Sequence, residues 1–184
     1  AGAAAALHAL VFGEGERGVR AFYAPDAERE IHGVFDGDAL VSALSFFPVE
    51  VGGAACVYMA GVCTHPDYRG RGLFRRNFAQ AKAATAYDAR NLFCIPANDS
   101  LFGLYESVGL RKRTCASLVS LDGSGSGGGY AFDGDYERLY ALYLASGPDV
   151  RHPFPLFRAC VDNFLAAGSA YYVQDGFALI GGAG

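Results

Sequence analysis

Apolar positions recur along the chain with two periods, about 3.6 and about 2 residues, and this mixture predicts helices interleaved with strands. Helical spacing or an apolar, alanine-rich composition predicts helices over residues 3–12, 19–23, 73–89, 100–108, 136–145 and 153–167. Short apolar runs predict strands over residues 30–35, 39–47, 54–64, 92–95, 110–121, 171–173 and 177–180. Strands mixed with helices in this order indicate an α/β or α+β fold.

Turn sequences stand between several of these elements. Asp36-Gly37-Asp38 and Gln174-Asp175-Gly176 each separate two apolar runs, which is a strong signal for a β-hairpin. Gly52-Gly53 marks a further turn before the strand over residues 54–64. Asn98 or Asp99 is the expected N-cap of the helix that follows, because Asn and Asp side chains accept from the free N–H groups there.

A glycine- and serine-rich stretch over residues 123–129 has the composition of a flexible linker. It divides the chain into a first domain over residues 1–122 and a small helical and hairpin module over residues 130–184. About fifty residues bury too little apolar surface for an independent core of much strength. We therefore expect the module to pack on the first domain.

Composition and charge exclude several classes of protein. The chain has 184 residues, of which 52% are hydrophobic and 18% charged, so it can bury a large core and is not intrinsically disordered. Its net charge of −4 disfavours a general nucleic-acid binder, which should be basic. No apolar run reaches the roughly 18 residues that a membrane span needs. The expected partners therefore include neither nucleic acid nor a membrane.

The cysteines and histidines indicate neither disulfides nor a metal. Five cysteines form an odd number without a C-x-x-C pair, and the four histidines have no ligand spacing. This pattern fits a reducing cytoplasm. The alanine-rich stretch over residues 1–10 lacks the basic segment of a signal peptide and is better explained as the start of a helix.

The segment from Val62 to Phe74 carries the clearest chemistry. A strand runs into Arg69-Gly70-Arg71-Gly72, and a helix opens directly afterwards. A helix start leaves backbone N–H groups unpaired at a positive dipole end, and glycines let a ligand approach the backbone closely. With the nearby arginines, the segment predicts a site for an anionic ligand such as a phosphate. The alternative is a tight strand–helix turn with solvated arginines; neither a Walker A loop nor a dinucleotide fingerprint is present.

Two motifs in this order resemble those of the GNAT N-acyltransferase superfamily. Arg69-x-x-Gly72-x-Phe74, placed after Val62-Cys63-Thr64, resembles its acyl-CoA-binding motif. Phe74 replaces the usual small residue. An aromatic residue at this position resembles the motif of a bacterial, Eis-like subgroup of the superfamily. The second motif is Asn98 followed by Tyr105-Glu106-x-x-Gly-Leu, where Phe is commoner than Leu. The resemblance covers residues 31–121 well and 1–30 loosely; the module from residue 130 resembles the start of a second acyltransferase-like half.

The resemblance implies a fold and a set of binding residues. The expected fold is a mixed, mostly antiparallel central sheet flanked by helices, with acetyl-CoA as co-substrate. Asn98 should hydrogen-bond the pantetheine arm, and Tyr105 should lie near the thioester sulfur and protonate the leaving thiolate. The expected backbone contacts are Val62, Cys63 and Thr64 to the pantetheine, and Gly70, Arg71, Gly72, Leu73, Phe74 and Arg75 to the pyrophosphate.

The general base is not fixed by the resemblance. Many members carry Glu at the position of Phe93, so proton removal must use water, Glu50, Asp99 or a terminal carboxylate. Cys63 lies beside the expected acyl site, but no His–acid pair accompanies it, so a buried strand thiol is favoured over a nucleophile. His65 is assigned no catalytic role.

Three functions follow from these observations. The leading one is an N-acetyltransferase that moves an acetyl group from acetyl-CoA to an amine of a small molecule or protein by direct attack in a ternary complex. The second is a catalytically weak module that binds and senses acyl-CoA, which the missing Glu favours. The third is an interaction domain or homodimer that uses the aromatic residues of the C-terminal module, although ordinary core packing also explains them.

Overall fold

The computed structural model describes residues 2–112, 130–131, 134–148, 150–166, 170–174 and 177–181. Four strands follow one another across a central sheet: β1 (Glu30–Asp36), β2 (Ala39–Val51), β3 (Ala54–Thr64) and β4 (Leu92–Cys94). The pairs β1–β2 and β2–β3 are antiparallel, and β3–β4 is parallel. A fifth strand, β6 (Val150–Arg151), pairs with the end of β2 that β1 leaves free.

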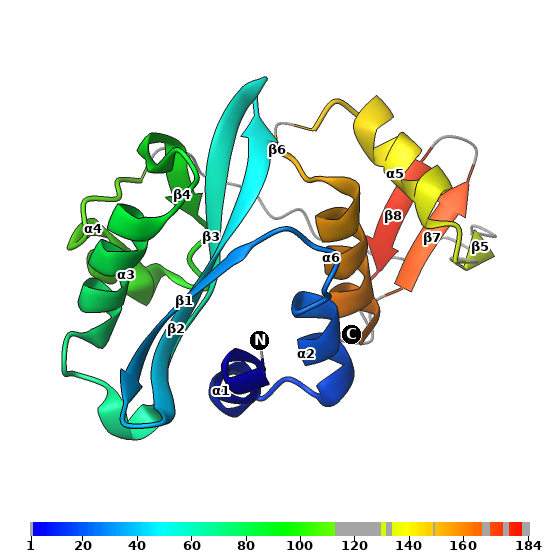
Figure 1. The fold of residues 1–184 in the computed structure, drawn as a ribbon. Helices are drawn as coiled ribbons and strands as arrows, with labels where there is room; N and C mark the ends of the chain where they lie inside the picture. Colours follow the sequence, from blue (N-terminus) through cyan, green and yellow to red (C-terminus); the bar gives the residue numbers. More distant parts are fainter. Residues whose placement is uncertain are drawn as a thin grey trace.

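Helices cover both faces of this sheet (Figure 1). On one face lie α3 (Leu73–Ala84) and α4 (Phe102–Glu106), and on the other lie α1 (Gly2–Phe12), α2 (Glu16–Phe22) and α6 (Phe154–Ala166). The fold is a mixed α/β structure with a mostly antiparallel central sheet flanked by helices, which confirms the expected fold class.

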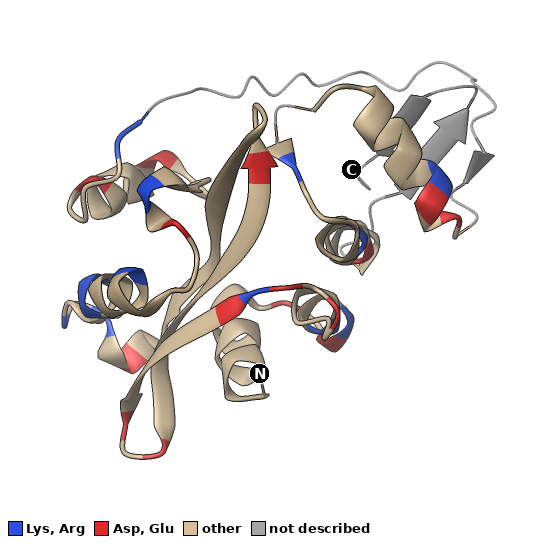
Figure 2. Cartoon of the chain, turned by 45° about the horizontal axis from the view of Figure 1, so that its top comes forward, with Lys and Arg blue, Asp and Glu red and all other residues tan. Residues whose placement is uncertain are grey.

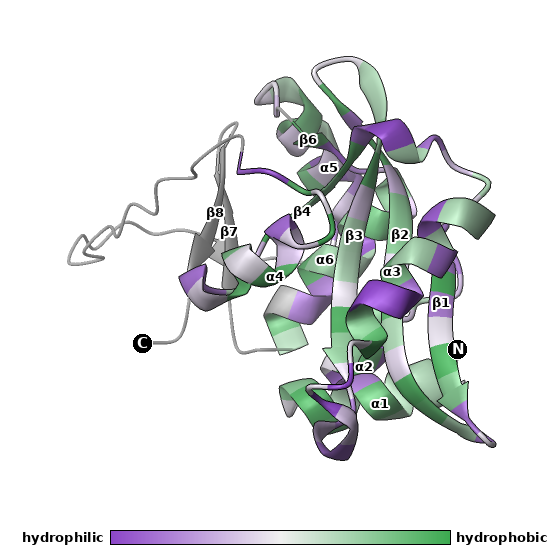
Figure 3. Ribbon diagram, turned by 90° about the vertical axis from the view of Figure 1, so that its left-hand side faces the viewer, coloured by the Kyte–Doolittle hydropathy of each residue, from purple (hydrophilic) through white to green (hydrophobic). Residues whose placement is uncertain are grey.

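Alternation along β2 builds the two layers of the core, because successive side chains of a strand point to opposite faces. Leu44 and Phe46 are fully buried and pack with Phe78 of α3. Phe47 faces the other way and packs with Leu156 of α6. Figure 3 shows the hydrophobic residues of β2 and β3 between the flanking helices. Burial on both faces explains why the strand is mostly apolar, and it extends to Val51, four residues beyond the predicted end.

Two helices are shorter than their sequence patterns predicted. α3 ends at Ala84 because Thr85 is extended, and the next N–H, that of Ala86, donates to Glu30 Oε1 at 2.9 Å. The segment over residues 100–108 begins as a 3-10 turn, η3 (Asp99–Leu101), and is α-helical only in α4. The predicted cap is confirmed at Asn98, whose Oδ1 accepts from Ser100 N at 3.1 Å. Two further 3-10 turns are η1 (Pro66–Tyr68) and η2 (Ala89–Asn91).

The C-terminal segment packs on the rest of the chain. α6 lies against α2, and Arg158 Nη2 forms an ion pair with Asp26 Oδ2 at 2.9 Å. Aromatic side chains of α5 (Tyr136–Ala145) and α6 stack together, with ring centroids of Tyr143 and Phe157 5.0 Å apart. They therefore contribute to the packing between these two helices. A second sheet contains β5 (Tyr130–Ala131), β7 (Ala170–Gln174) and β8 (Phe177–Gly181), and its β7–β8 hairpin was predicted.

The strand predicted over residues 110–121 begins with residues 110–112, which are not in a strand. The remainder of that prediction, and the linker over residues 123–129, lie outside the described residues. In the part of the chain that the structure describes, no helix combines the length and apolarity needed to cross a membrane.

Candidate functional site

The central sheet splits between β3 and β4. Their parallel pairing runs from Val57 opposite Leu92 to Met59 opposite Cys94, where β4 ends. β3 continues to Thr64, and among the described residues no strand pairs with this part of β3 on the β4 side. The backbone of the last residues of β3 therefore borders an open edge. The predicted pantetheine-binding residues Val62, Cys63 and Thr64 all lie on this stretch.

A β-bulge lies where the two strands part. Ser45 pairs with Ala60 and Ala43 with Cys63, so Gly61 and one neighbour on β3 face a single residue of β2. Gly61 has φ +61°, a left-handed conformation that favours glycine. A Cβ at this position would also lie 2.8 Å from Phe22 Cζ. The glycine therefore permits both the bulge and the close approach of α2, and a bulge bends the strand that carries it.

Side chains of the loop after β3 fix its conformation. The His65 ring accepts a hydrogen bond from Asp67 N at 3.3 Å, which caps η1. Tyr68 donates to Asp36 Oδ2 at 2.8 Å and so ties the loop to the β1–β2 hairpin. Arg71 donates to the Asp67 carbonyl at 2.8 Å, and its guanidinium lies 4.7 Å from the centre of the Tyr68 ring. These contacts within the loop and to the β1–β2 hairpin hold the loop in place.

The start of α3 leaves its backbone donors free. Gly70 and Gly72 both have φ above +70°, and Gly72 is the N-cap without a side-chain cap. The first helical hydrogen bond is donated by Arg76 N to the Gly72 carbonyl at 3.1 Å. The N–H groups of the preceding helical turn therefore have no partner within the helix. This arrangement suits an anion, since the helix dipole adds partial positive charge at the same point.

Tyr105 lies on the α3 side of the split and is 8% exposed. Its ring meets the ring of Phe74 edge-on, with the centroids 5.7 Å apart. Burial raises the pKa of Tyr105 to about 12, so the phenol keeps its proton at neutral pH. Asn98 is exposed near the end of β4, and its side-chain oxygen is occupied by the cap of η3. The structure therefore places Tyr105 and the first turn of α3 in contact.

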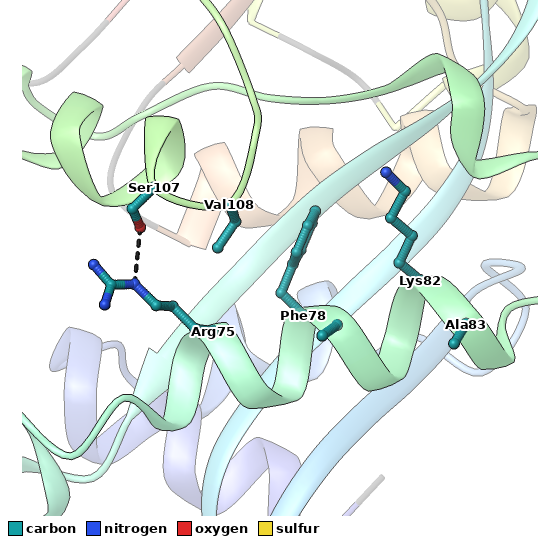
Figure 4. A pocket seen from close by; sticks show the side chains of 7 residues that line it. Arg75, Phe78, Lys82, Ala83, Ser107 and Val108 are labelled. Carbon is teal, nitrogen blue, oxygen red and sulfur yellow. Dashed lines mark hydrogen bonds between the residues drawn. The ribbon is translucent and has the colours of Figure 1, made fainter.

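A pocket of about 510 Å³ lies between α3 and α4 (Figure 4). Its floor is apolar, and Arg75 and Lys82 carry positive charge on its α3 side. Arg75 Nε donates to Ser107 Oγ at 3.0 Å. Figure 2 shows that Lys and Arg also mark the outer surface of α3. The lining residues are Arg75, Phe78, Ala79, Lys82, Ala83, Ser107 and Val108.

The sequence analysis missed Lys82, although a signal was present. Residues 75, 78, 79 and 82 are separated by three, four and seven positions, which places them on one face of a helix. The buried stripe of α3 is the neighbouring face, with Phe74, Phe78 and Ala81. Lys82 lies about two turns after the loop of residues 69–72, here called the glycine loop. It could therefore have been assigned to the anionic ligand predicted for that loop.

The structure does not bring Glu50 to this site. It pairs with Ala55 at the far end of β3, six residues and roughly 20 Å along the strand from Gly61 at about 3.3 Å per residue. Its carboxylate lies 3.6 Å from Arg151 Nη1 of β6. Phe93 lies on the opposite face of the sheet from Tyr105 and stacks on Tyr58, with the centroids 5.3 Å apart.

Cys63 is buried, and burial raises the pKa of its thiol to about 11. The thiol is therefore protonated at neutral pH, as expected of a core residue rather than a nucleophile. Among the described residues, no cluster of three or more His, Cys, Asp or Glu side chains is arranged to hold a metal ion.

Acetyltransferases are among the solved structures that superpose on this chain, and the one with a TM-score above 0.5 supports the fold. An aminoglycoside 6'-N-acetyltransferase from Acinetobacter haemolyticus superposes with a TM-score of 0.52 at 14% identity, covering 66% of this chain and 91% of that one. An acetyltransferase from Trypanosoma brucei superposes with a TM-score of 0.49 at 17% identity, covering 65% of this chain and 92% of that one. An aminoglycoside acetyltransferase from an uncultured soil metagenome gives 0.47 at 10% identity, covering 65% and 87%.

Sequence comparison identifies the family. Among curated proteins, none matches the chain significantly. The family model described as "Acetyltransferase (GNAT) domain" matches residues 2–111, which include the split between β3 and β4, the glycine loop and Tyr105. The chain therefore belongs to the GNAT acetyltransferase family.

Proposed function

We propose that this protein is an N-acetyltransferase that transfers the acetyl group of acetyl-CoA directly to an amine within a ternary complex. The observation that carries the proposal is the free donor set at the start of α3 directly beside the open edge of β3. An extended ligand with a diphosphate at one end and a thioester at the other fits this pair of features. Family membership supports acyl-CoA as that ligand.

The proposed placement of acetyl-CoA uses three parts of the site. The diphosphate lies on the N–H groups of residues 70–75, the pantetheine arm runs along residues 62–64 of β3, and the free amide nitrogen of Asn98 hydrogen-bonds the arm. The adenosine end, which carries a further phosphate, lies in the pocket between α3 and α4. Arg75 and Lys82 supply the charge that this phosphate needs.

The proposed reaction is acyl transfer with two proton movements. The amine nitrogen attacks the thioester carbon and gives up one proton to a basic group or to water, a C–N bond forms, and the C–S bond breaks. Tyr105 gives its proton to the departing sulfur, since its phenol is protonated at neutral pH. Holding both reactants in one site removes the entropy cost of their encounter. The acceptor is an amine of a small molecule or a protein.

Several finer assignments belong to the same proposal. We place the chain in the Eis-like subgroup, which the buried aromatic Phe74 and the module after residue 130 support. The division into residues 1–122 and 130–184, and a homodimeric assembly, stay predictions.

A second function is an acyl-CoA sensor with weak catalysis. The observation that favours it is Phe93, whose ring stacks on Tyr58 at the position where many relatives carry a carboxylate. A sensor would bind acetyl-CoA through the same N–H groups of residues 70–75, here called the anion cradle, but would not consume it.

Two measurements separate these functions. Thermal unfolding with and without acetyl-CoA reports binding, because a ligand that binds only the folded state raises its stability. Thiol release with a panel of small amines and lysine peptides then reports transfer. Binding with amine-dependent thiol release supports the transferase, and binding without release supports the sensor. If acetyl-CoA leaves the unfolding temperature unchanged, both are wrong.

A further inference from the structure

A buried histidine faces the bulge of β3 from α1. His8 is 3% exposed, and a Cβ on Gly61 would lie 3.6 Å from its Nδ1. Its other ring nitrogen, Nε2, lies 3.3 Å from Oε2 of Glu14 in the turn after α1. In the described part of the chain, Nδ1 has no hydrogen-bond partner. The imidazole thus has a carboxylate on one side and the split strand on the other.

Packing alone does not account for this arrangement. A buried polar group without a hydrogen bond costs about 1–3 kcal/mol, so a core position would favour an apolar side chain. The rings of Phe12, Phe22 and Tyr23 surround the imidazole with centroids 4.5, 4.7 and 5.5 Å away. These rings leave Nδ1 on the side of the imidazole that faces Gly61 of β3. A nitrogen held without a partner beside a reaction site is available to a ligand.

The other titratable groups around His8 are engaged. The Tyr23 hydroxyl donates to the Ala4 carbonyl at 3.2 Å, and the Cys63 thiol has a raised pKa. Arg29 donates to the carbonyls of Phe22 and Ala24 on the far side of Tyr23. Glu14 is the carboxylate that contacts the imidazole. Burial lowers the pKa of His8 and Glu14 partly opposes the change, so the ring is neutral and basic at physiological pH.

His8 and Tyr105 lie on opposite sides of β3. Tyr105 packs with Met59 in the core beneath α3, whereas Cys63 packs with Leu7 of α1 in the core on the other face. The bulge at Gly61 lies between these positions, where β3 leaves β4. An acyl group in the split would therefore have a proton donor on one face and a proton acceptor on the other. That is the arrangement needed when an amine enters from one side and a thiolate leaves on the other.

We propose that His8 Nδ1 accepts the proton that the acceptor amine loses, while Glu14 orients the ring and passes the proton to solvent. This inference rests on the proposed acetyl transfer. As the C–N bond forms and the C–S bond breaks, the amine proton moves to His8 and the Tyr105 proton moves to sulfur. His8 then releases its proton to water through Glu14. Tyr105 takes up a proton from water, which restores its phenol. Glu14 suits the exit role because its side chain is one-third exposed.

The test is the pH dependence of kcat/KM in wild type and two variants. General bases contribute roughly 10²- to 10⁴-fold, so His8→Gln should lower kcat by that factor and remove the acidic limb of the profile. Glu14→Gln should move the limb to lower pH, because the lost negative charge had raised the pKa of His8. Glu14 is one-third exposed, which makes this variant safer for folding. Coenzyme A affinity, measured by calorimetry, should be unchanged in both.

His32→Gln is the matched control. His32 Nε2 also lies close to a carboxylate oxygen, Glu30 Oε2, at a distance of 2.9 Å, but both residues are on β1, away from the split. Its kcat/KM profile should match wild type. Wild-type rates in His8→Gln, or an unmoved limb in Glu14→Gln, would overturn the role of His8 and leave acetyl transfer standing. A wild-type protein that binds coenzyme A but transfers to no amine would instead overturn both proposals.

Discussion

Replacing Gly72 by alanine tests the anion cradle directly. Gly72 has φ +71° and open space around the added methyl group, so the change introduces backbone strain without a clash. A left-handed alanine costs about 1–2 kcal/mol. Relief of that strain rotates the backbone that presents the N–H groups to the diphosphate. A hydrogen bond to a charged group contributes about 1.5–3 kcal/mol, so the loss of one predicts a roughly 10- to 150-fold weaker affinity for coenzyme A.

Gly53→Ala provides the matched control. Gly53 has φ +81°, equally open surroundings, and a position in the β2–β3 turn. Both variants should therefore lose a similar free energy of unfolding in a denaturant titration. Isothermal titration calorimetry with coenzyme A should show weakened binding in the Gly72 variant alone. Wild-type affinity in Gly72→Ala, or an equal loss in Gly53→Ala, would refute the assignment of this backbone to the diphosphate.

Three further predictions follow from the same geometry. Tyr105→Phe should lower kcat by roughly 10²-fold or more and leave coenzyme A affinity unchanged, because it removes a proton donor but keeps the ring. Steady-state thiol release measures kcat and calorimetry measures the affinity. An unchanged kcat would contradict the prediction. Lys82→Ala should weaken coenzyme A binding roughly 2- to 5-fold, as expected for an exposed ion pair, but leave dephospho-coenzyme A binding unchanged, and an equal effect on both ligands would count against the pocket. Gly61→Ala should lower the free energy of unfolding by about 2–5 kcal/mol, because left-handed backbone strain adds to the close contact with Phe22. Gly37 has φ +58° in open space, so Gly37→Ala should lose only the part that comes from strain. Urea unfolding compares the two variants.

Local sequence signals predicted much of the fold, including the loop that precedes α3. The hairpin between β1 and β2, the glycine loop and the cap at Asn98 each depend on a few consecutive residues, and all three are present. The functional prediction also needed the family motifs, because residue types at the loop do not by themselves distinguish coenzyme A from another phosphorylated ligand.

The features that sequence reasoning missed depend on contacts between distant segments. Periodicity does not reveal that β4 pairs with β3 only as far as Met59, so the length of the open edge was not predictable. Nor does it show that Glu50 lies opposite Ala55, well away from the bulge. His8 had no distinguishing neighbours in the sequence, and only the approach of α1 to Gly61 makes it a candidate.

The pairing of β6 with β2 has a consequence for how the chain reaches its native state. Arg151 pairs with Glu50, and about 100 residues of chain must be closed into a loop before that contact forms. Contacts between such remote residues slow folding, because the entropy of loop closure is lost before the contact contributes any stabilisation. The hairpins of β1, β2 and β3 are local and can form first. Until the last third of the chain arrives, the end of β2 has unpaired backbone groups and is exposed to aggregation.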